Sequence, residues 1–427
     1  MRRTSARSRG SIRDGNSTEK IFYGWWVVLT AATGLLLGYA PIFVFSFGVF
    51  VKSLVKEFHS NRTQISLAFT LANVMISVSS PLAGRLVDRF GARRVILPGT
   101  LIFCFLLICF KFISTSLWQL YVLFIALGLS GSGTVPVPYL KVISNWFDRR
   151  RGLALGLTMA GAGIGAMVMP PIAQRLMSVL GWRSAYATLS VLGLVVALPM
   201  VALLLKDSPK EKGLLPNGGV DFHAQSEERP EKQGLTWSVA RSSSTFWLMV
   251  CGFSLVGASV HACVIHLVSM LTDHGVSAEN AALASSALGV ALLLGRVGSG
   301  YVLDRVFAPY VAIFFFSGVA CGLSLLWVGA DGAAAFVGAS LVGLGMGAEG
   351  DLIAYLTSRY FGLRSFGEIY GYLFSAYTLS GALGPLLMAI GFDRAGSYRL
   401  PLVLFLIATI TATVLMTRLG QYRYRPV

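Results

Sequence analysis

Long apolar segments, separated by short polar loops, occupy almost the whole chain. A helix that crosses a bilayer needs about 20 apolar residues, because the hydrocarbon core is about 30 Å thick. Twelve segments meet this requirement, so we predict an all-α membrane protein with little room for a soluble domain. The predicted spans are 24–50, 63–84, 95–113, 117–143, 152–176, 183–205, 244–271, 279–303, 309–330, 333–358, 367–391 and 398–418.

The longest polar interruption is the segment 206–243, which is rich in Pro, Gly and charged residues. Such a composition is typical of a flexible linker. It divides the chain into two predicted six-helix bundles, 23–205 and 244–418, flanked by tails at 1–22 and 419–427. The end of the linker, "TWSVARSS", is compatible with a short interfacial helix.

The two predicted bundles resemble copies of one another. Three pairs of landmarks have nearly the same separation along the chain, which argues against chance. The pairs are "GRLVDRFG" (84–91) with "GYVLDRVF" (300–307), "SNWFDRRRG" (144–152) with "SRYFGLRSF" (358–366), and Pro171 with Pro385. Duplicated six-helix halves place a binding site between them, near the bilayer midplane. We therefore expect two pseudo-symmetric six-helix bundles.

The composition agrees with this picture: 55% of the 427 residues are hydrophobic and only 13% are charged. The net charge of +16 alone would suggest an acidic partner such as nucleic acid. However, the Lys and Arg residues gather in the tails and in the loops on the same side of the predicted membrane. By the positive-inside rule, this bias predicts cytoplasmic termini and gives no reason to expect nucleic-acid binding.

The chain offers little catalytic chemistry. We expect no cleavable signal peptide, because the first span is too long and lacks a cleavage site. No phosphate-binding glycine loop, metal cluster or nucleophile motif is present, so we expect neither an enzyme nor an ATP-driven pump. We also expect no metal, no cofactor and no obligatory protein partner beyond the lipid bilayer. The five cysteines are predicted to be buried apolar residues in spans: Cys104, Cys109, Cys251, Cys263 and Cys321.

Arg296 is the most informative residue, because it interrupts the apolar eighth span. It lies eight residues before Asp304, which we place at the cytoplasmic end of that span. This spacing puts Arg296 about 12 Å deep, where an arginine costs about 3 kcal/mol or more. Two hypotheses account for it: the guanidinium binds a substrate carboxylate in a two-pronged contact, or it forms a structural ion pair with a buried acid.

Two acids in the tenth span, Glu349 and Asp351, lie at a similar depth. Residues two apart on a helix point about 200° apart, so only one of the two is expected to face a central cavity. That acid could pair with Arg296 or carry a proton, while the other bonds to neighbouring helices. His261, in the seventh span, is a further proton or cavity candidate; its alternative is a satisfied core histidine.

The remaining candidates rest on residue type and position alone. Pro136 and Pro138 break the fourth span, and a broken helix is tolerated where it lines a cavity. Nearby, Tyr139 could donate to a carboxylate, whereas Lys141 is interpreted as a charge that sets topology. For every candidate the alternative is packing between helices. The substrate-site candidates are Tyr39, Phe43, Asn73, Tyr139, His261, Leu292, Arg296, Tyr377 and Ser380.

Several motifs resemble those of known transporters. "GRLVDRFGARRV" after the second span resembles the cytoplasmic signature of the major facilitator superfamily, and "GYVLDR" is its degenerate copy. "YGWWVV" (23–28) and "NWFDRRRGLALGLTMAGAGIG" (145–165) resemble signatures of the monocarboxylate porters, which the oxalate:formate antiporters largely share. The resemblance implies an anion-binding role for the arginine of the eighth span. It also implies a cytoplasmic gate formed by the signature residues, which are Asp88, Arg89, Arg93, Arg94 and Asp304.

The chain departs from these families at informative positions. The porters carry an aspartate four residues before the eighth-span arginine, where this chain has Leu292. The eleventh-span lysine of the oxalate antiporters is also absent, since no Lys or Arg lies within 366–392. A single cation favours a substrate with one carboxylate, and the proton role falls to Glu349, Asp351 or His261.

The resulting hypothesis is proton symport of a small monocarboxylate, similar to lactate or pyruvate, across a plasma membrane, which we expect to be a bacterial inner membrane. The runner-up hypothesis is an organic-anion exchanger of the oxalate:formate type. A transporter-like ligand sensor and a drug exporter are further alternatives. A sensor would carry an added signalling domain, and a buried cation is poorly suited to cationic drugs.

Overall fold

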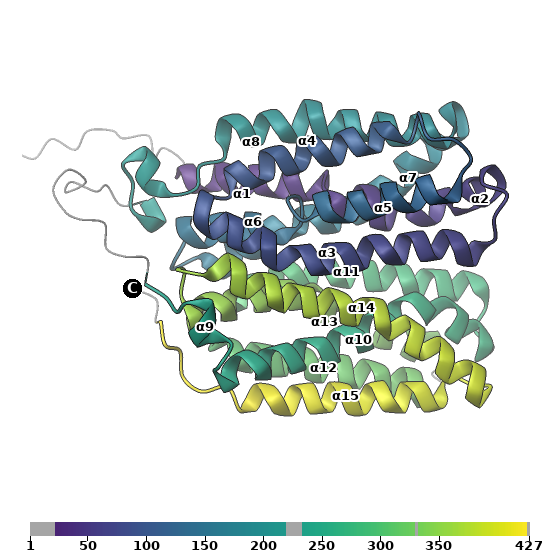
Figure 1. Cartoon of the computed structure of the whole chain (residues 1–427). Coiled ribbons are helices and arrows are strands. Elements are labelled where there is room, and N and C mark those ends of the chain that lie inside the picture. The colour runs from purple at the N-terminus through teal and green to yellow at the C-terminus, as the bar shows by residue number, and fades with distance from the viewer. Residues whose placement is uncertain (1–21, 219–232, 329–331, 425–427) are drawn as a thin grey trace, which may run out of the picture.

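Helices lying side by side in two layers make up the protein (Figure 1). The computed structural model describes residues 22–218, 233–328 and 332–424. The predicted N-terminal tail, the middle of the linker and the last three residues lie outside the described residues. Within them the protein is helical, with one isolated bridge between Gly234 and Gly362.

The N-terminal bundle begins at Tyr23 and ends at Leu204. Its elements are α1 (Tyr23–Leu36), the π-helix η1 (Ala40–Phe45), α2 (Phe47–Glu57), α3 (Arg62–Phe90), α4 (Arg93–Cys109), α5 (Leu117–Gly131), α6 (Pro136–Trp146), α7 (Arg151–Leu192), the π-helix η2 (Gly193–Ala197) and α8 (Leu198–Leu204).

The C-terminal bundle consists of α10 (Ser244–Asp273), α11 (Ala278–Leu303), α12 (Ala308–Val328), α13 (Gly332–Phe361), α14 (Phe366–Ala395) and α15 (Arg399–Thr417). Between the bundles the linker forms the short helices η3 (Pro209–Lys212), η4 (Pro216–Gly218) and α9 (Trp237–Ala240). The sequence-predicted short helix before the seventh span is therefore present as α9.

The described helices account for the predicted spans. Ten helical stretches are long and apolar enough to cross a membrane. One of them, Arg151–Leu204, contains two spans, because Gly181 interrupts the helix with φ +76° and ψ 164°. Helix α4, with 17 residues, is just short of a full span. The predicted all-α fold with two six-helix bundles is confirmed.

Prolines explain where two spans bend. Pro41 opens η1, and Pro136 begins α6 after a break that follows Gly131. A proline lacks the N–H that an α-helix interior requires, so it is accommodated at a first turn or a local bulge. The bend in the fourth span fits an aromatic side chain inside its own bundle: a Cβ on Gly34 of α1 would overlap the Tyr139 hydroxyl.

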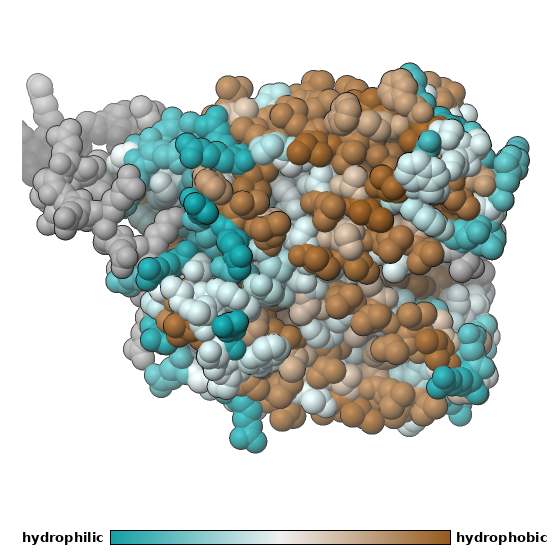
Figure 2. Space-filling model, in the orientation of Figure 1, coloured by the Kyte–Doolittle hydropathy of each residue, from teal (hydrophilic) through white to brown (hydrophobic). Residues whose placement is uncertain are grey.

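The outer surface is apolar around its middle. Figure 2 shows a broad hydrophobic zone that crosses both bundles, with hydrophilic residues gathered at the two ends. Large side chains such as Phe105, Trp118, Phe314 and Leu404 are exposed on the helices. A continuous apolar surface of this size is typical of contact with lipid.

The two bundles meet most closely at one end of the molecule. We call it the linker end, because it carries residue 22, the linker segments 206–218 and 233–243, and residue 424 (Figure 1). A Cβ on Gly84 of α3 would overlap the Gly367 carbonyl oxygen of α14, and a Cβ on Gly152 of α7 would overlap that of Gly300 in α11. Helix backbones approach this closely only where side chains are absent. Toward the opposite end, the far end, α14 turns away from α3 in Figure 1.

We expect the Gly84→Val substitution to separate α3 from α14 and to lower the melting temperature of the purified protein in detergent. Overpacking a tight contact costs about 1–3 kcal/mol. Gly289→Val in α11 is the matched control, because nothing lies within 4 Å of a Cβ there. Equal melting temperatures for the two variants would contradict a tight contact at Gly84.

Candidate functional site

Arg296 lies in the interior of α11, on the part of the helix that packs against α7 of the other bundle. Its side chain is half-buried. The Nη1 atom donates to the carbonyl oxygen of Met159 in α7 at 3.4 Å, and the buried Nε atom has no hydrogen-bond partner. The guanidinium therefore reaches across the contact between the bundles.

The guanidinium of Arg296 is not locked onto a protein carboxylate. Among the described residues, no carboxylate oxygen lies within 4.0 Å of its nitrogen atoms. Glu349 and Asp351, both in α13, interact with it electrostatically at longer range. The direct ion pair that was the alternative to ligand binding is thus absent among these residues. The N–H donors of the guanidinium remain available to a ligand.

The two acids have different environments, although neither side chain is exposed. One oxygen of Asp351 accepts from the Ser299 hydroxyl of α11 at 3.2 Å, and the other has no partner. Glu349 faces Tyr377 of α14, but neither of its oxygens forms a hydrogen bond of normal geometry. The two carboxyl groups point to different neighbours, although both interact with Arg296.

Unpartnered polar atoms gather around Arg296. They are the Nε atom of Arg296, both oxygens of Glu349, one oxygen of Asp351 and the hydroxyl of Tyr370. A buried polar group without a partner costs about 1–3 kcal/mol, so a concentration of such groups indicates a place for a ligand, a proton or water. We call Arg296, Ser299, Glu349, Asp351, Tyr370 and Tyr377 the polar cluster.

His261 of α10 borders this cluster. Its Nδ1 atom bonds to the carbonyl oxygen of Gly257 at 2.8 Å, and its ring meets the Tyr377 ring edge-on with centroids 5.6 Å apart. Ser380 donates to the Tyr377 carbonyl oxygen at 2.8 Å, and the backbone of Leu292 in α11 packs against Gly347. The structure therefore brings Tyr377 close to Arg296, with His261 behind Tyr377, whereas Ser380 bonds within its own helix.

The candidates from the N-terminal bundle lie elsewhere. Phe43 is fully buried among other phenylalanine rings, and Tyr39 packs against it. Tyr139 is buried beneath α1, and the Asn73 amide donates to the Phe69 carbonyl oxygen of its own helix at 2.9 Å. The structure does not bring these four residues to the polar cluster. In a helix that is apolar on every side, the sequence does not distinguish the face toward the partner bundle.

Two aspartates join the bundles at the linker end by the same geometry. Asp88, at the end of α3, accepts from the backbone N–H groups of Gly367 and Glu368 at the start of α14, at 3.0 and 2.9 Å. Asp304, after α11, accepts from Gly152 and Leu153 at the start of α7, at 2.6 and 2.9 Å. A negative charge at a helix N-terminus is stabilised by the free N–H groups and the helix dipole. The duplicated motif thus forms a reciprocal pair of caps.

A family model described as Major Facilitator Superfamily matches residues 31–385. The chain belongs to the major facilitator superfamily. Together with the apolar helices, this membership identifies an integral, multi-pass membrane transporter and not an enzyme.

Curated relatives place this major facilitator protein near the monocarboxylate porters. Monocarboxylate transporter 11 of Mus musculus is 27% identical over 384 residues, which cover 88% of this chain and 83% of the relative. Monocarboxylate transporter 2 of Homo sapiens is 24% identical over 392 residues, which cover 88% of this chain and 81% of the relative. The predicted resemblance to this group is confirmed.

Solved structures of the superfamily share the fold. The proton:xylose symporter XylE superposes with a TM-score of 0.73 at 13% identity, covering 94% of this chain and 97% of that chain. The Escherichia coli fucose:proton symporter FucP gives a TM-score of 0.63 at 17% identity, covering 93% and 98%. At these identities the likeness establishes the arrangement of the helices.

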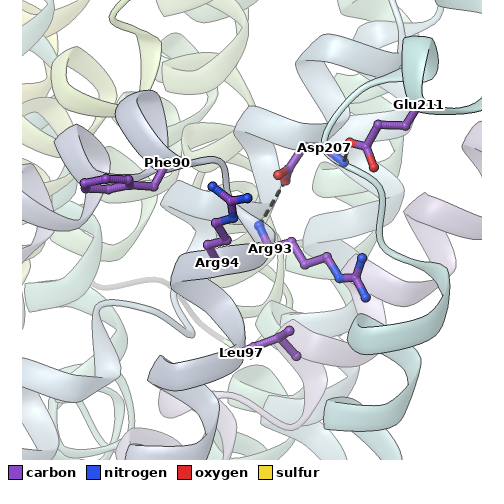
Figure 3. Close-up of a pocket in the computed structure, with 6 residues that line it drawn as sticks. All are labelled: Phe90, Arg93, Arg94, Leu97, Asp207 and Glu211. Carbon is purple, nitrogen blue, oxygen red and sulfur yellow. Dashed lines mark hydrogen bonds between the residues drawn. The ribbon is translucent and has the colours of Figure 1, made fainter.

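The basic residues of the major facilitator signature do not join the two bundles, contrary to the expectation. Arg89 is exposed and lies over the ring of Phe90. The Arg93 side chain donates to the Ala202 carbonyl oxygen of its own bundle, and its backbone N–H donates to Asp207 at 2.9 Å. Arg94 is exposed; Figure 3 shows it with Arg93 beside Asp207, around a surface pocket. This basic run secures α4 to α8 and to the start of the linker.

Other charged residues join the two bundles at the linker end. Lys141, interpreted from sequence as a topology charge, is only 2% exposed, pairs with Asp88 at 3.0 Å and donates to the Leu363 carbonyl oxygen of the C-terminal bundle. Arg85 pairs with Glu368 across the bundles at 2.6 Å. These residues lie in or beside the duplicated segments. Their position there could have indicated from the sequence that they belong to the contact between the bundles.

A second charged group joins the loop before α7 to the end of α13. Asp148 accepts from Arg359 at 2.8 Å and pairs with Arg151 at 3.2 Å, while Arg151 also donates to the Ser358 hydroxyl at 3.0 Å. Asp304 lies nearby, and its burial raises its pKa more than the amide donors of Gly152 and Leu153 lower it. The linker-end contact is therefore both charged and largely buried.

We expect Asp88→Asn to destabilise the protein by about 3 kcal/mol, because it leaves the buried Lys141 amine without its carboxylate. Asp304→Asn should cost about 1 kcal/mol, since mainly one amide hydrogen bond is lost. Thermal melting in detergent measures both. Adding Lys141→Gln to Asp88→Asn should recover part of the loss; equal destabilisation by the two aspartate variants would contradict the paired role of Lys141.

Proposed function

We propose that the protein transports a small monocarboxylate together with a proton by alternating access. One observation carries this proposal: Arg296 lies at the contact between the bundles with a guanidinium that no protein carboxylate occupies. The guanidinium carries a permanent positive charge and presents paired N–H donors. Such a group, held away from lipid, is suited to a carboxylate ligand.

The surroundings of Arg296 favour a substrate with one carboxylate. Helix α14 contributes hydroxyl groups but no Lys or Arg before Arg394. The Leu293 side chain and the Arg296 guanidinium border the same glycine, Gly163 of α7, so Leu293 supplies apolar atoms beside the guanidinium. A short carbon chain with one acid group, as in lactate or pyruvate, fits one cation beside apolar walls. A dicarboxylate would leave its second charge beside the buried acids Glu349 and Asp351.

The relatives support the substrate class. Two relatives with most of their length aligned are named monocarboxylate transporters. The two solved neighbours are proton symporters for sugars, and at their low identity they contribute the fold alone. Proton coupling is therefore proposed from Glu349 and Asp351 in the polar cluster and from His261, which borders it; these are the titratable candidates.

The linker-end contact supplies the gate of the proposed cycle. The distribution of Lys and Arg predicts that this end is cytoplasmic, in which case the described state is closed to the cytoplasm. Asp88 and Asp304 would release the helix ends of α14 and α7 when the bundles, 23–205 and 244–418, rock apart. Anion binding would neutralise Arg296 and favour this movement. The relatives named above give no support for a bacterial membrane.

We expect lactate uptake into proteoliposomes to rise several-fold with an inward-directed proton gradient and to collapse on addition of a protonophore. Symport requires both, because the proton gradient drives the anion. Uptake that ignores the gradient but requires anion loaded inside the vesicles would instead establish the exchanger.

We expect Arg296→Gln to reduce lactate uptake at least 100-fold, because a neutral amide lacks the charge that offsets desolvation of the carboxylate. Arg89→Gln is the matched control, since Arg89 is exposed at the linker end. Uptake and equilibrium binding of labelled lactate measure the effect. Retained affinity in Arg296→Gln would overturn the assigned site.

A further inference from the structure

We infer that Glu349 is the group that carries the coupled proton, with Tyr377 as its positioning residue, and that Asp351 serves to fix α11 against α13. This inference rests on the proposed symport and selects one of its three candidate proton sites.

The hydrogen bonds of the two acids separate their roles. Asp351 is held by Ser299, and its accepting oxygen lies 3.4 Å from where a Cβ on Gly156 of α7 would be. It therefore occupies a filled contact between three helices. Glu349 is equally buried and faces Tyr377, but neither of its oxygens forms a hydrogen bond of normal geometry. A buried carboxyl that is poorly hydrogen-bonded is costly as an anion and readily held as a neutral acid, which suits a group that must gain and lose a proton.

Tyr377 is placed to serve both states of Glu349. Its hydroxyl can donate to an ionised carboxylate and accept from a protonated one. The ring is held by packing: a Cβ on Gly257 of α10 would lie 2.8 Å from it, and the His261 ring meets it edge-on. Gly381 in turn makes room for His261, since a Cβ there would lie 3.2 Å from the imidazole.

His261 is better suited to holding Tyr377 than to carrying the proton. Its Nδ1 atom is committed to the carbonyl oxygen of Gly257, which fixes the ring and the position of one proton. Among the described residues, the charged or titratable groups that face Glu349 are Arg296 from α11 and Tyr377 from α14; α7 and α12 contribute none, and α10 contributes His261 behind Tyr377.

The neighbourhood of Glu349 and Arg296 accounts for the coupling between the proton and the anion. When Glu349 is ionised, its charge attracts the guanidinium and repels a substrate carboxylate. A proton taken from water forms the O–H bond of the neutral acid and removes this competitor. Arg296 is then free to bind the anion. On the opposite side, loss of the anion restores the attraction, and the proton leaves to water.

The test measures lactate binding and lactate exchange in Glu349→Gln, a variant that resembles the protonated acid. The wild-type dissociation constant should fall as pH falls, by about tenfold per pH unit at most for one linked proton. Glu349→Gln should bind lactate with no pH dependence, exchange it across the membrane, and lose the response to a proton gradient. Glu279→Gln, an exposed acid at the far end, is the matched control and should resemble the wild type.

Two further variants keep the inference falsifiable. Asp351→Asn should retain the response to the gradient, whatever its effect on rate, and Tyr377→Phe should shift the pH midpoint of binding. The inference is wrong if Glu349→Gln still responds to the gradient, if it loses binding and exchange together, or if Asp351→Asn loses the response. A wild type without gradient-driven lactate uptake would instead refute the proposed function itself.

Discussion

Accommodating one cation between two apolar bundles is the constraint on which the rest of this structure depends. An arginine at this depth is expensive unless it is partly satisfied. Here the Met159 carbonyl oxygen contacts Arg296, and Glu349 and Asp351 interact with it from beyond contact distance. A direct ion pair would hold the cation permanently, whereas this incomplete arrangement leaves it able to accept another negative group.

The site and the linker-end contact share the same helices. Helix α11 carries Arg296 and ends at Asp304, eight residues or about 12 Å further along. Helix α14 carries Tyr377 and begins at the backbone groups that Asp88 caps. A change in how these helices sit at Arg296 must therefore reach the capped helix ends. Both caps are hydrogen bonds from backbone N–H groups to a carboxylate, and Asp88 is in addition paired with the buried Lys141.

Much of the fold follows from the sequence, because span length and loop charge are set by the bilayer and not by distant contacts. The same holds for Arg296, whose depth follows from its distance to Asp304. The rotation of each helix about its own axis does not follow from the sequence in the same way. Tyr39, Phe43 and Tyr139 lie inside the N-terminal bundle, since an apolar helix presents no polar side to indicate which face meets the partner bundle. Lys141 was interpreted wrongly because its partners, Asp88 and Leu363, are far away in sequence.

The most direct test of the central claim is a solid-state NMR distance measurement between carboxyl-labelled lactate and the nitrogen-labelled guanidinium of Arg296 in lipid bilayers. The account predicts a dipolar coupling equivalent to a carbon–nitrogen distance of about 4 Å, as in a two-pronged arginine–carboxylate contact, and its loss in Arg296→Lys. Bound lactate that shows no coupling to this guanidinium would contradict the account.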